Sequence, residues 1–122
     1  MIDLYGIPNC DTMKKARRWL DEHGIEYRFH DYKKDGIDET TLRGWAEKVG
    51  WEVLLNRRGM MWRRLPEATR EAMDEALALQ VMRETPSIIK RPLLDTGEAR
   101  YLGFSPERYA GIFATDPGAP TP

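Results

Sequence analysis

The sequence contains one cysteine, Cys10, in 122 residues. A single cysteine cannot close an internal disulfide, which excludes the disulfide-stapled class of small secreted domains, and it also excludes a four-cysteine zinc site. The two histidines, His23 and His30, do not show a metal-ligand spacing with Cys10. We therefore expect no structural metal and no bound cofactor.

A surplus of charge of one sign and long apolar runs are also missing. The chain has 19 basic and 20 acidic residues and a net charge of −1, which argues against a strong electrostatic attraction to nucleic acid or to a membrane surface. No segment approaches the ~20 consecutive apolar residues that a membrane span needs, and Met1–Tyr5 show no basic leader. We expect a cytoplasmic monomer without direct nucleic-acid or membrane partners.

What is present is an ordinary globular composition, 41% apolar and 32% charged. The length fits one domain with one sizeable core. We expect this single domain to span residues 1–114. Residues 115–122 are rich in proline, glycine and alanine, and are predicted to be a disordered tail.

The patterns at the start of the chain indicate a β-α-β unit. Residues 2–5 alternate between apolar and polar side chains, which predicts a strand followed by a tight loop. Residues 11–23 fit an amphipathic helix that stops at Gly24, and residues 25–30 alternate again. A short β-α-β connection implies a right-handed crossover and a parallel strand pair.

The remainder predicts helices, a hairpin and a closing helix. After a helix that begins at Asp38, residues 53–65 are irregular and basic, and residues 66–84 read as one long helical region. Residues 93–102 fit a β-hairpin, and a last helix starts at Ser105. The fold class is α/β and thioredoxin-like: a mixed sheet with a parallel β-α-β start, an antiparallel hairpin and an inserted helical block.

Cys10 is the candidate reactive centre because it follows the first strand where the first helix begins. Unpaired N–H groups and a partial positive charge at a helix N-terminus stabilise a thiolate. Lys14 and Lys15, about one turn on, add to this field, whereas the carboxylate of Asp11 opposes a second negative charge. The alternative is a small buried cysteine without chemistry.

Three segments resemble the arsenate reductase and Spx (ArsC-like) family, most closely its YffB-like branch. They are residues 5–16 (YGIPNCDTMKKA), 54–59 (LLNRRG) and 88–94 (IIKRPLL), and the resemblance covers nearly the whole chain up to the tail. It implies a thioredoxin-like fold with an inserted helical block and a nucleophile at Cys10. In the reductases this thiol attacks arsenate and is resolved by glutathione and glutaredoxin.

The resemblance also implies a substrate site. Arg91 would lie beside the substrate oxyanion, because a guanidinium offers planar bidentate donors, and Pro92 would be the cis-proline of the fold. Arg58 would be a second arginine at the site, although the adjacent Arg57 leaves the register open. Thr12 and Lys14 complete the predicted substrate-binding set. The alternative for the arginines is a solvated basic surface.

Departures from the family pattern weigh against arsenate reduction itself. The reductases have Gly, Thr, Ser and Arg after the cysteine, where this chain has residues 11–14 (DTMK). They carry an arginine before the last helix, where this chain has Gly103 or Phe104. Position 13 is Met, so the two-cysteine switch of Spx regulators cannot form within the chain.

The sequence therefore predicts a glutathione-dependent thiol oxidoreductase with a single nucleophilic cysteine. Attack by Cys10 on a disulfide or another electrophile would give a mixed disulfide, which an external thiol releases. The expected partners are glutathione or a small thiol or disulfide, and glutaredoxin. The alternative is an Spx-like, non-catalytic regulatory protein that binds RNA polymerase; the variant Cys10→Ser would keep partner binding in that case.

Overall fold

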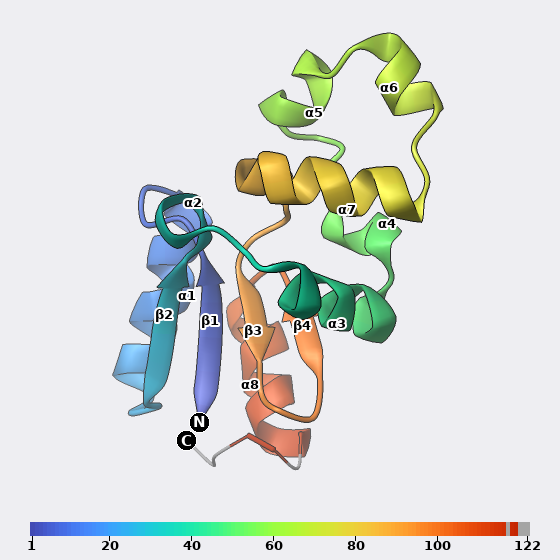
Figure 1. The fold of residues 1–122 in the computed structure, drawn as a ribbon. Helices are drawn as coiled ribbons and strands as arrows, with labels where there is room; N and C mark the ends of the chain where they lie inside the picture. The colour runs from blue at the N-terminus through green and yellow to red at the C-terminus, as the bar shows by residue number, and fades with distance from the viewer. Residues whose placement is uncertain (117, 120–122) are drawn as a thin grey trace. The chain divides into compact units, whose positions relative to one another are not determined.

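The computed structural model describes residues 1–116 and 118–119, and the chain divides into two compact units (Figure 1). The first unit combines Met1–Asp31 with the residues from Arg91 onward, and the second is the continuous segment Tyr32–Lys90. The helical block predicted between the second and third strands is therefore an insertion into the first unit.

The first unit contains a four-stranded mixed sheet with the strand order β2-β1-β3-β4. The strands are β1 (Ile2–Gly6), β2 (Tyr27–Asp31), β3 (Leu93–Asp95) and β4 (Arg100–Leu102). β1 pairs in parallel with β2 and antiparallel with β3, and β3 pairs antiparallel with β4. The predicted fold, with a parallel start and an antiparallel hairpin, is confirmed.

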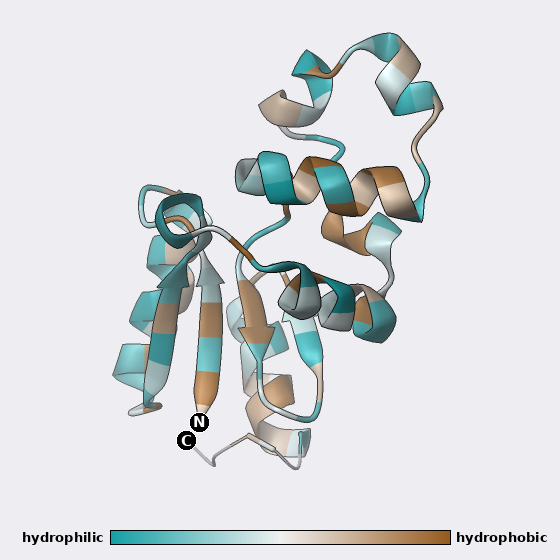
Figure 2. Ribbon diagram, viewed as in Figure 1, coloured by the Kyte–Doolittle hydropathy of each residue, from teal (hydrophilic) through white to brown (hydrophobic). Residues whose placement is uncertain are grey.

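Strand β1 separates an apolar face of the sheet from a polar one. Ile2 and Leu4 are buried, whereas Asp3 and Tyr5 are partly exposed. The matching alternation of hydrophobic and hydrophilic residues along β1 is visible in Figure 2. The buried face packs against α1 (Asp11–Glu22) and α8 (Pro106–Thr115) in one cluster. Burial of each large aliphatic side chain there contributes about 1.5–3 kcal/mol. The helices supply Met13, Ala16, Trp19, Leu20, Tyr109, Ile112 and Phe113.

Local hydrogen bonds and the backbone conformation of Gly24 define the two ends of helix α1. Its N-cap is Cys10, whose carbonyl accepts the first helical hydrogen bond from the Lys14 N–H at 3.0 Å. At the other end, Nδ1 of His23 lies 2.8 Å from the carbonyl oxygen of Trp19. Gly24 has φ = +67°, a left-handed conformation that glycine adopts without a Cβ clash. The predicted helix and its glycine stop are confirmed.

The second unit is helical. It contains α2 (Tyr32–Asp35), α3 (Glu39–Val49), α4 (Trp51–Leu54), α5 (Met60–Arg64), α6 (Glu67–Glu71), α7 (Glu75–Glu84) and the 3₁₀ turn η1 (Pro86–Ile88). The prediction of one long helical region over residues 66–84 is wrong, because α6 ends at Glu71 and α7 begins only at Glu75. The carboxylate of Asp74 caps α7 by accepting the N–H of Leu77 at 2.9 Å.

Buried side chains of α3, α4 and α7 hold the second unit together. These helices contact one another, and they bury Leu42, Trp45 and Met82 completely or almost so. Asp38 caps α3, as predicted, by accepting the Thr41 N–H at 2.7 Å.

Hydrogen bonds join the C-terminal end of the described chain to the β3–β4 hairpin. The carboxylate of Asp116, which is buried, accepts hydrogen bonds from the hydroxyls of Thr96 and Tyr101, both at 2.7 Å. Residues 117 and 120–122 of the predicted disordered tail lie outside the described residues. Both the single domain over residues 1–114 and the disordered tail stay predictions.

Candidate functional site

Cys10 lies at the end of the loop that follows β1 and opens α1. Its backbone is extended (φ −125°, ψ 128°), so it is the N-cap of the helix and not its first turn. The side chain is partly exposed and packs against the apolar cluster of the first unit. The thiol is therefore accessible and lies at the positive end of a helix, as the sequence predicted.

The surroundings of the Cys10 sulfur favour the thiolate. Partial burial raises the pKa of this thiol, but hydrogen bonds from the backbone N–H of Met13, the guanidinium of Arg91 and the N–H of Thr12 outweigh it and lower the pKa below its ordinary value. The positive charge of Arg91 adds to the effect. A free thiolate is the nucleophilic form of cysteine.

Arg91 reaches the thiol from the segment that leads into β3. The Arg91–Pro92 peptide bond is cis, as the resemblance implies. Pro92 is buried, and its carbonyl accepts the N–H of Gly103 at 3.0 Å, beyond β4. The structure thus brings Cys10, Arg91 and Pro92 together in the first unit, although they are separated by about 80 residues of chain.

Of the other predicted residues, Thr12 and Lys14 belong to the first unit and Arg58 to the second. Thr12 donates its N–H to the Cys10 sulfur, and Lys14 is exposed in the first turn of α1. Arg58 belongs to the second unit, in a loop where its N–H donates to Oδ1 of Asn56 at 3.3 Å. Its place in a substrate site with Cys10 stays a prediction.

Met13 and Gly6 contribute contacts at the site that the sequence did not predict. Met13 is fully buried and supplies an N–H to the thiol. Its side chain fills the space beside Gly6, where an added Cβ would overlap the sulfur of Met13. A lone glycine at the end of a strand is the sequence signal for such a close approach.

Phe104 lies at the end of the sheet where the resemblance leads one to expect an arginine. Its ring packs edge-on against Tyr109 of α8, with 4.6 Å between the ring centroids. The residue therefore contributes apolar packing and no positive charge.

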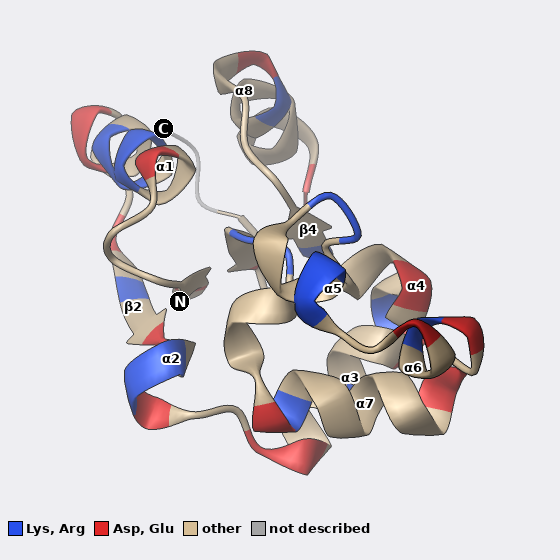
Figure 3. Ribbon diagram, turned by 90° about the horizontal axis from the view of Figure 1, so that it is seen from above, with Lys and Arg blue, Asp and Glu red and all other residues tan. Residues whose placement is uncertain are grey.

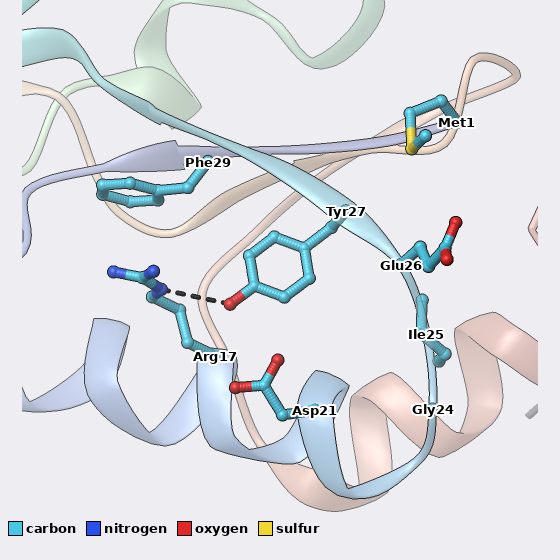
Figure 4. Close-up of a pocket in the computed structure, with 8 residues that line it drawn as sticks. All are labelled: Met1, Arg17, Asp21, Gly24, Ile25, Glu26, Tyr27 and Phe29. Carbon is cyan, nitrogen blue, oxygen red and sulfur yellow. Dashed lines mark hydrogen bonds between the residues drawn. The ribbon is translucent and has the colours of Figure 1, made fainter.

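A separate hollow of about 620 Å³ lies between α1 and β2 (Figure 4). The Arg17 side chain crosses it: Nε donates to the Tyr27 hydroxyl at 3.1 Å, and the guanidinium lies 4.3 Å from the Phe29 ring centroid. Its lining includes Asp21 but neither Cys10 nor Arg91. We place the candidate site at Cys10, because the lining of this hollow does not include the thiol or the Arg91 guanidinium beside it.

Two structural features are absent from residues 1–116 and 118–119. No cluster of His, Cys, Asp and Glu in these residues is arranged to hold a metal ion. No helix in the same residues has the length and apolar character to cross a membrane.

The chain is similar to several known proteins over most of its length. A protein of Haemophilus influenzae is 43% identical over 114 residues, which span 93% of this chain and 100% of its own. The structure of the YffB protein is 51% identical, covers 91% of this chain and 97% of its own, and superposes with a TM-score of 0.87. The solution structure of an arsenate reductase (ArsC) related protein from Brucella melitensis is 50% identical, with 92% and 93% coverage and a TM-score of 0.76.

The ArsC family model matches residues 5–112. This range includes Cys10, the inserted helical unit, Arg91 and Pro92, so the family match covers the candidate site. The chain belongs to the ArsC family, whose members are related to arsenate reductase.

Proposed function

We propose that this chain is a glutathione-dependent monothiol oxidoreductase whose nucleophile is Cys10. The observation that supports it most strongly is the lowered pKa of the Cys10 thiol, which receives hydrogen bonds from Met13, Arg91 and Thr12 despite partial burial. A larger thiolate fraction at neutral pH increases the rate of attack on disulfides.

The proposed reaction is thiol–disulfide exchange in two steps at Cys10. The Cys10 thiolate attacks one sulfur of a disulfide; a new S–S bond to the enzyme forms as the substrate S–S bond breaks, and the other half leaves as a thiolate that takes a proton from water. The thiolate of glutathione, or of another external thiol such as glutaredoxin, then attacks the mixed disulfide. The Cys10 thiolate leaves, and the external thiol is now joined by a disulfide to the second half of the substrate. A second external thiolate cleaves that disulfide, so two external thiols together supply the two electrons that reduce the substrate.

Positive groups around Cys10 suit the carboxylates of glutathione. Arg91 offers a planar guanidinium next to the sulfur, and Lys14 offers an ammonium one helical turn away. We propose that Arg58 joins them, that Thr12 contacts the bound tripeptide and that the backbone at Pro92 pairs with it.

Arsenate is the less favoured substrate. A tetrahedral oxyanion needs several donors or cations around it, and Phe104 supplies an apolar ring where the reductase pattern has an arginine. Asp11 places a carboxylate in the first turn of the same helix. We propose that the protein acts as a monomer in the cytoplasm, where glutathione keeps thiols reduced.

The test is the glutathione-dependent reduction of bis(2-hydroxyethyl) disulfide, followed through NADPH consumption by added glutathione reductase. We expect turnover by the wild type, none by Cys10→Ser and unchanged turnover by Arg18→Gln, which removes an exposed charge further along α1. Equal rates for the wild type and Cys10→Ser would refute the proposal. An Spx-like regulator is the competing class, and we place it second because Met13 leaves it without the second thiol of a redox switch.

A further inference from the structure

The inserted unit carries a concentration of positive charge that the proposed chemistry uses only through Arg58. We call residues 57–64 the basic segment; its arginines are Arg57, Arg58, Arg63 and Arg64, and all four are exposed. In the described part of the chain none of them forms an ion pair with a carboxylate. Four uncompensated cations in eight residues contrast with a chain whose net charge is −1 (Figure 3).

Hydrogen bonds to the backbone fix the shape of the basic segment. The Arg63 guanidinium donates to the carbonyl oxygens of Arg58 at 2.9 Å and Gly59 at 3.5 Å. Arg70 of α6 donates to the carbonyls of Arg63 at 2.9 Å and Leu65 at 3.0 Å. These bonds hold α5 without using the side chains of Arg57 and Arg64, so binding a partner would order little additional backbone.

Apolar side chains accompany the positive charges. Met60 is 60% exposed, and it is one of only three exposed large apolar side chains in the described residues. Trp62 is half-buried, and the Arg57 guanidinium lies 5.3 Å from its ring centroid. Methionine, tryptophan and arginine are the residue types enriched in protein–protein interfaces, and methionine adapts to partners of different shape.

We propose that the basic segment is a docking surface for an acidic protein segment in which carboxylates alternate with apolar side chains. The carboxylates would pair with Arg57 and Arg64, and an apolar side chain would cover Met60. Nucleic acid fits less well, because Trp62 is the only aromatic residue of the segment and already has Arg57 over its ring. A membrane fits less well, because a five-residue helix offers no long apolar face.

The test uses fluorescence anisotropy with a fluorescein-labelled peptide of alternating glutamate and leucine, added to the full chain at low ionic strength. Arg57→Glu combined with Arg64→Glu should weaken binding about tenfold or more, because both charge pairs are reversed. The matched control reverses two exposed charges of the same unit, Lys48→Glu with Arg83→Glu, and should change the affinity by less than about twofold.

A second variant separates the contribution of the apolar contact from that of the charge pairs. Met60→Ser removes an exposed apolar group without altering charge. It should weaken binding of the glutamate–leucine peptide but leave binding of a glutamate–serine peptide unchanged. Circular dichroism checks that each variant is folded.

Three results would overturn the proposal: no binding of the peptide, an equal loss in the control variant, or tighter binding of labelled oligothymidylate or of phosphatidylserine vesicles than of the peptide. The readout is peptide binding and not thiol chemistry, so this proposal and the proposed function can fail independently.

Discussion

Replacing Arg91 by glutamine tests whether its guanidinium lowers the pKa of the Cys10 thiol. The substitution keeps a polar side chain of similar reach but removes the positive charge and the charge-assisted hydrogen bond to the Cys10 sulfur. The N–H groups of Met13 and Thr12 still stabilise the thiolate. The pKa of Cys10 should therefore rise from its value in the wild type, but not by the whole of the stabilisation that the site provides.

The size of the effect follows from one charge-assisted hydrogen bond at a partly exposed site. Such a bond contributes about 1.5–3 kcal/mol when buried, and solvent screening reduces it to about 1 kcal/mol here. A loss of about 1 kcal/mol lowers the thiolate fraction about fivefold at pH values below the pKa. A more basic thiolate is intrinsically more nucleophilic, with a Brønsted coefficient of about 0.4–0.5, so the net loss of alkylation rate should be about two- to threefold.

The assay is the rate of Cys10 alkylation by iodoacetamide as a function of pH. Arg91→Gln should react more slowly than the wild type at neutral pH and slightly faster well above the pKa, so the two pH profiles cross. Arg91→Lys should fall between them, because it keeps the charge without the planar guanidinium. Superimposable profiles for the wild type and Arg91→Gln would refute the role of Arg91, and the same shift in Arg18→Gln would show that net charge alone is responsible.

Three further substitutions test the site and its support. Met13→Cys places a second thiol three residues after Cys10; oxidation should then give an internal disulfide, seen as a loss of two hydrogens in intact mass, and the smaller buried side chain should cost about 1–3 kcal/mol of stability in urea unfolding. Gly6→Ala forces a Cβ against the buried Met13 sulfur, so we expect it to destabilise the fold by about 1–3 kcal/mol, and a stability within error of the wild type would contradict this contact. Burial raises the pKa of Asp116, but hydrogen bonds from Tyr101, Thr96 and the Gly118 N–H outweigh it and lower the pKa. The stability from this carboxylate is thus present above about pH 4 and is lost as pH falls through the folded pKa. Asp116→Asn should therefore reduce the loss of unfolding free energy on acidification. An unchanged acid dependence would show that other groups cause this loss.

The position of the candidate cysteine could be predicted from the sequence because it depends on local rules. A strand, a short loop and an amphipathic helix place Cys10 at a helix N-terminus, whatever the rest of the chain does. Gly24 and Asp38 likewise fixed the ends of their helices through their own conformational preferences. Arg91 was found through the family resemblance, since no local rule connects it to Cys10 across so long an insertion.

What could not be predicted depends on geometry in three dimensions. The sequence left open whether Asp11 or the positive groups would dominate at Cys10. The answer depends on the direction of the guanidinium and of two N–H groups, which together lower the pKa. The break over residues 72–74 was missed because it lies in a run of good helix formers, where composition favours one continuous helix.

Intact mass spectrometry after incubation with oxidised glutathione tests the central claim most directly. The wild type at neutral pH should gain a single glutathione by a mixed disulfide, the adduct should disappear on addition of reduced thiol, and Cys10→Ser should gain none. A wild-type chain that remains unmodified while its fold is intact would contradict the claim that Cys10 is a nucleophilic thiol of an oxidoreductase.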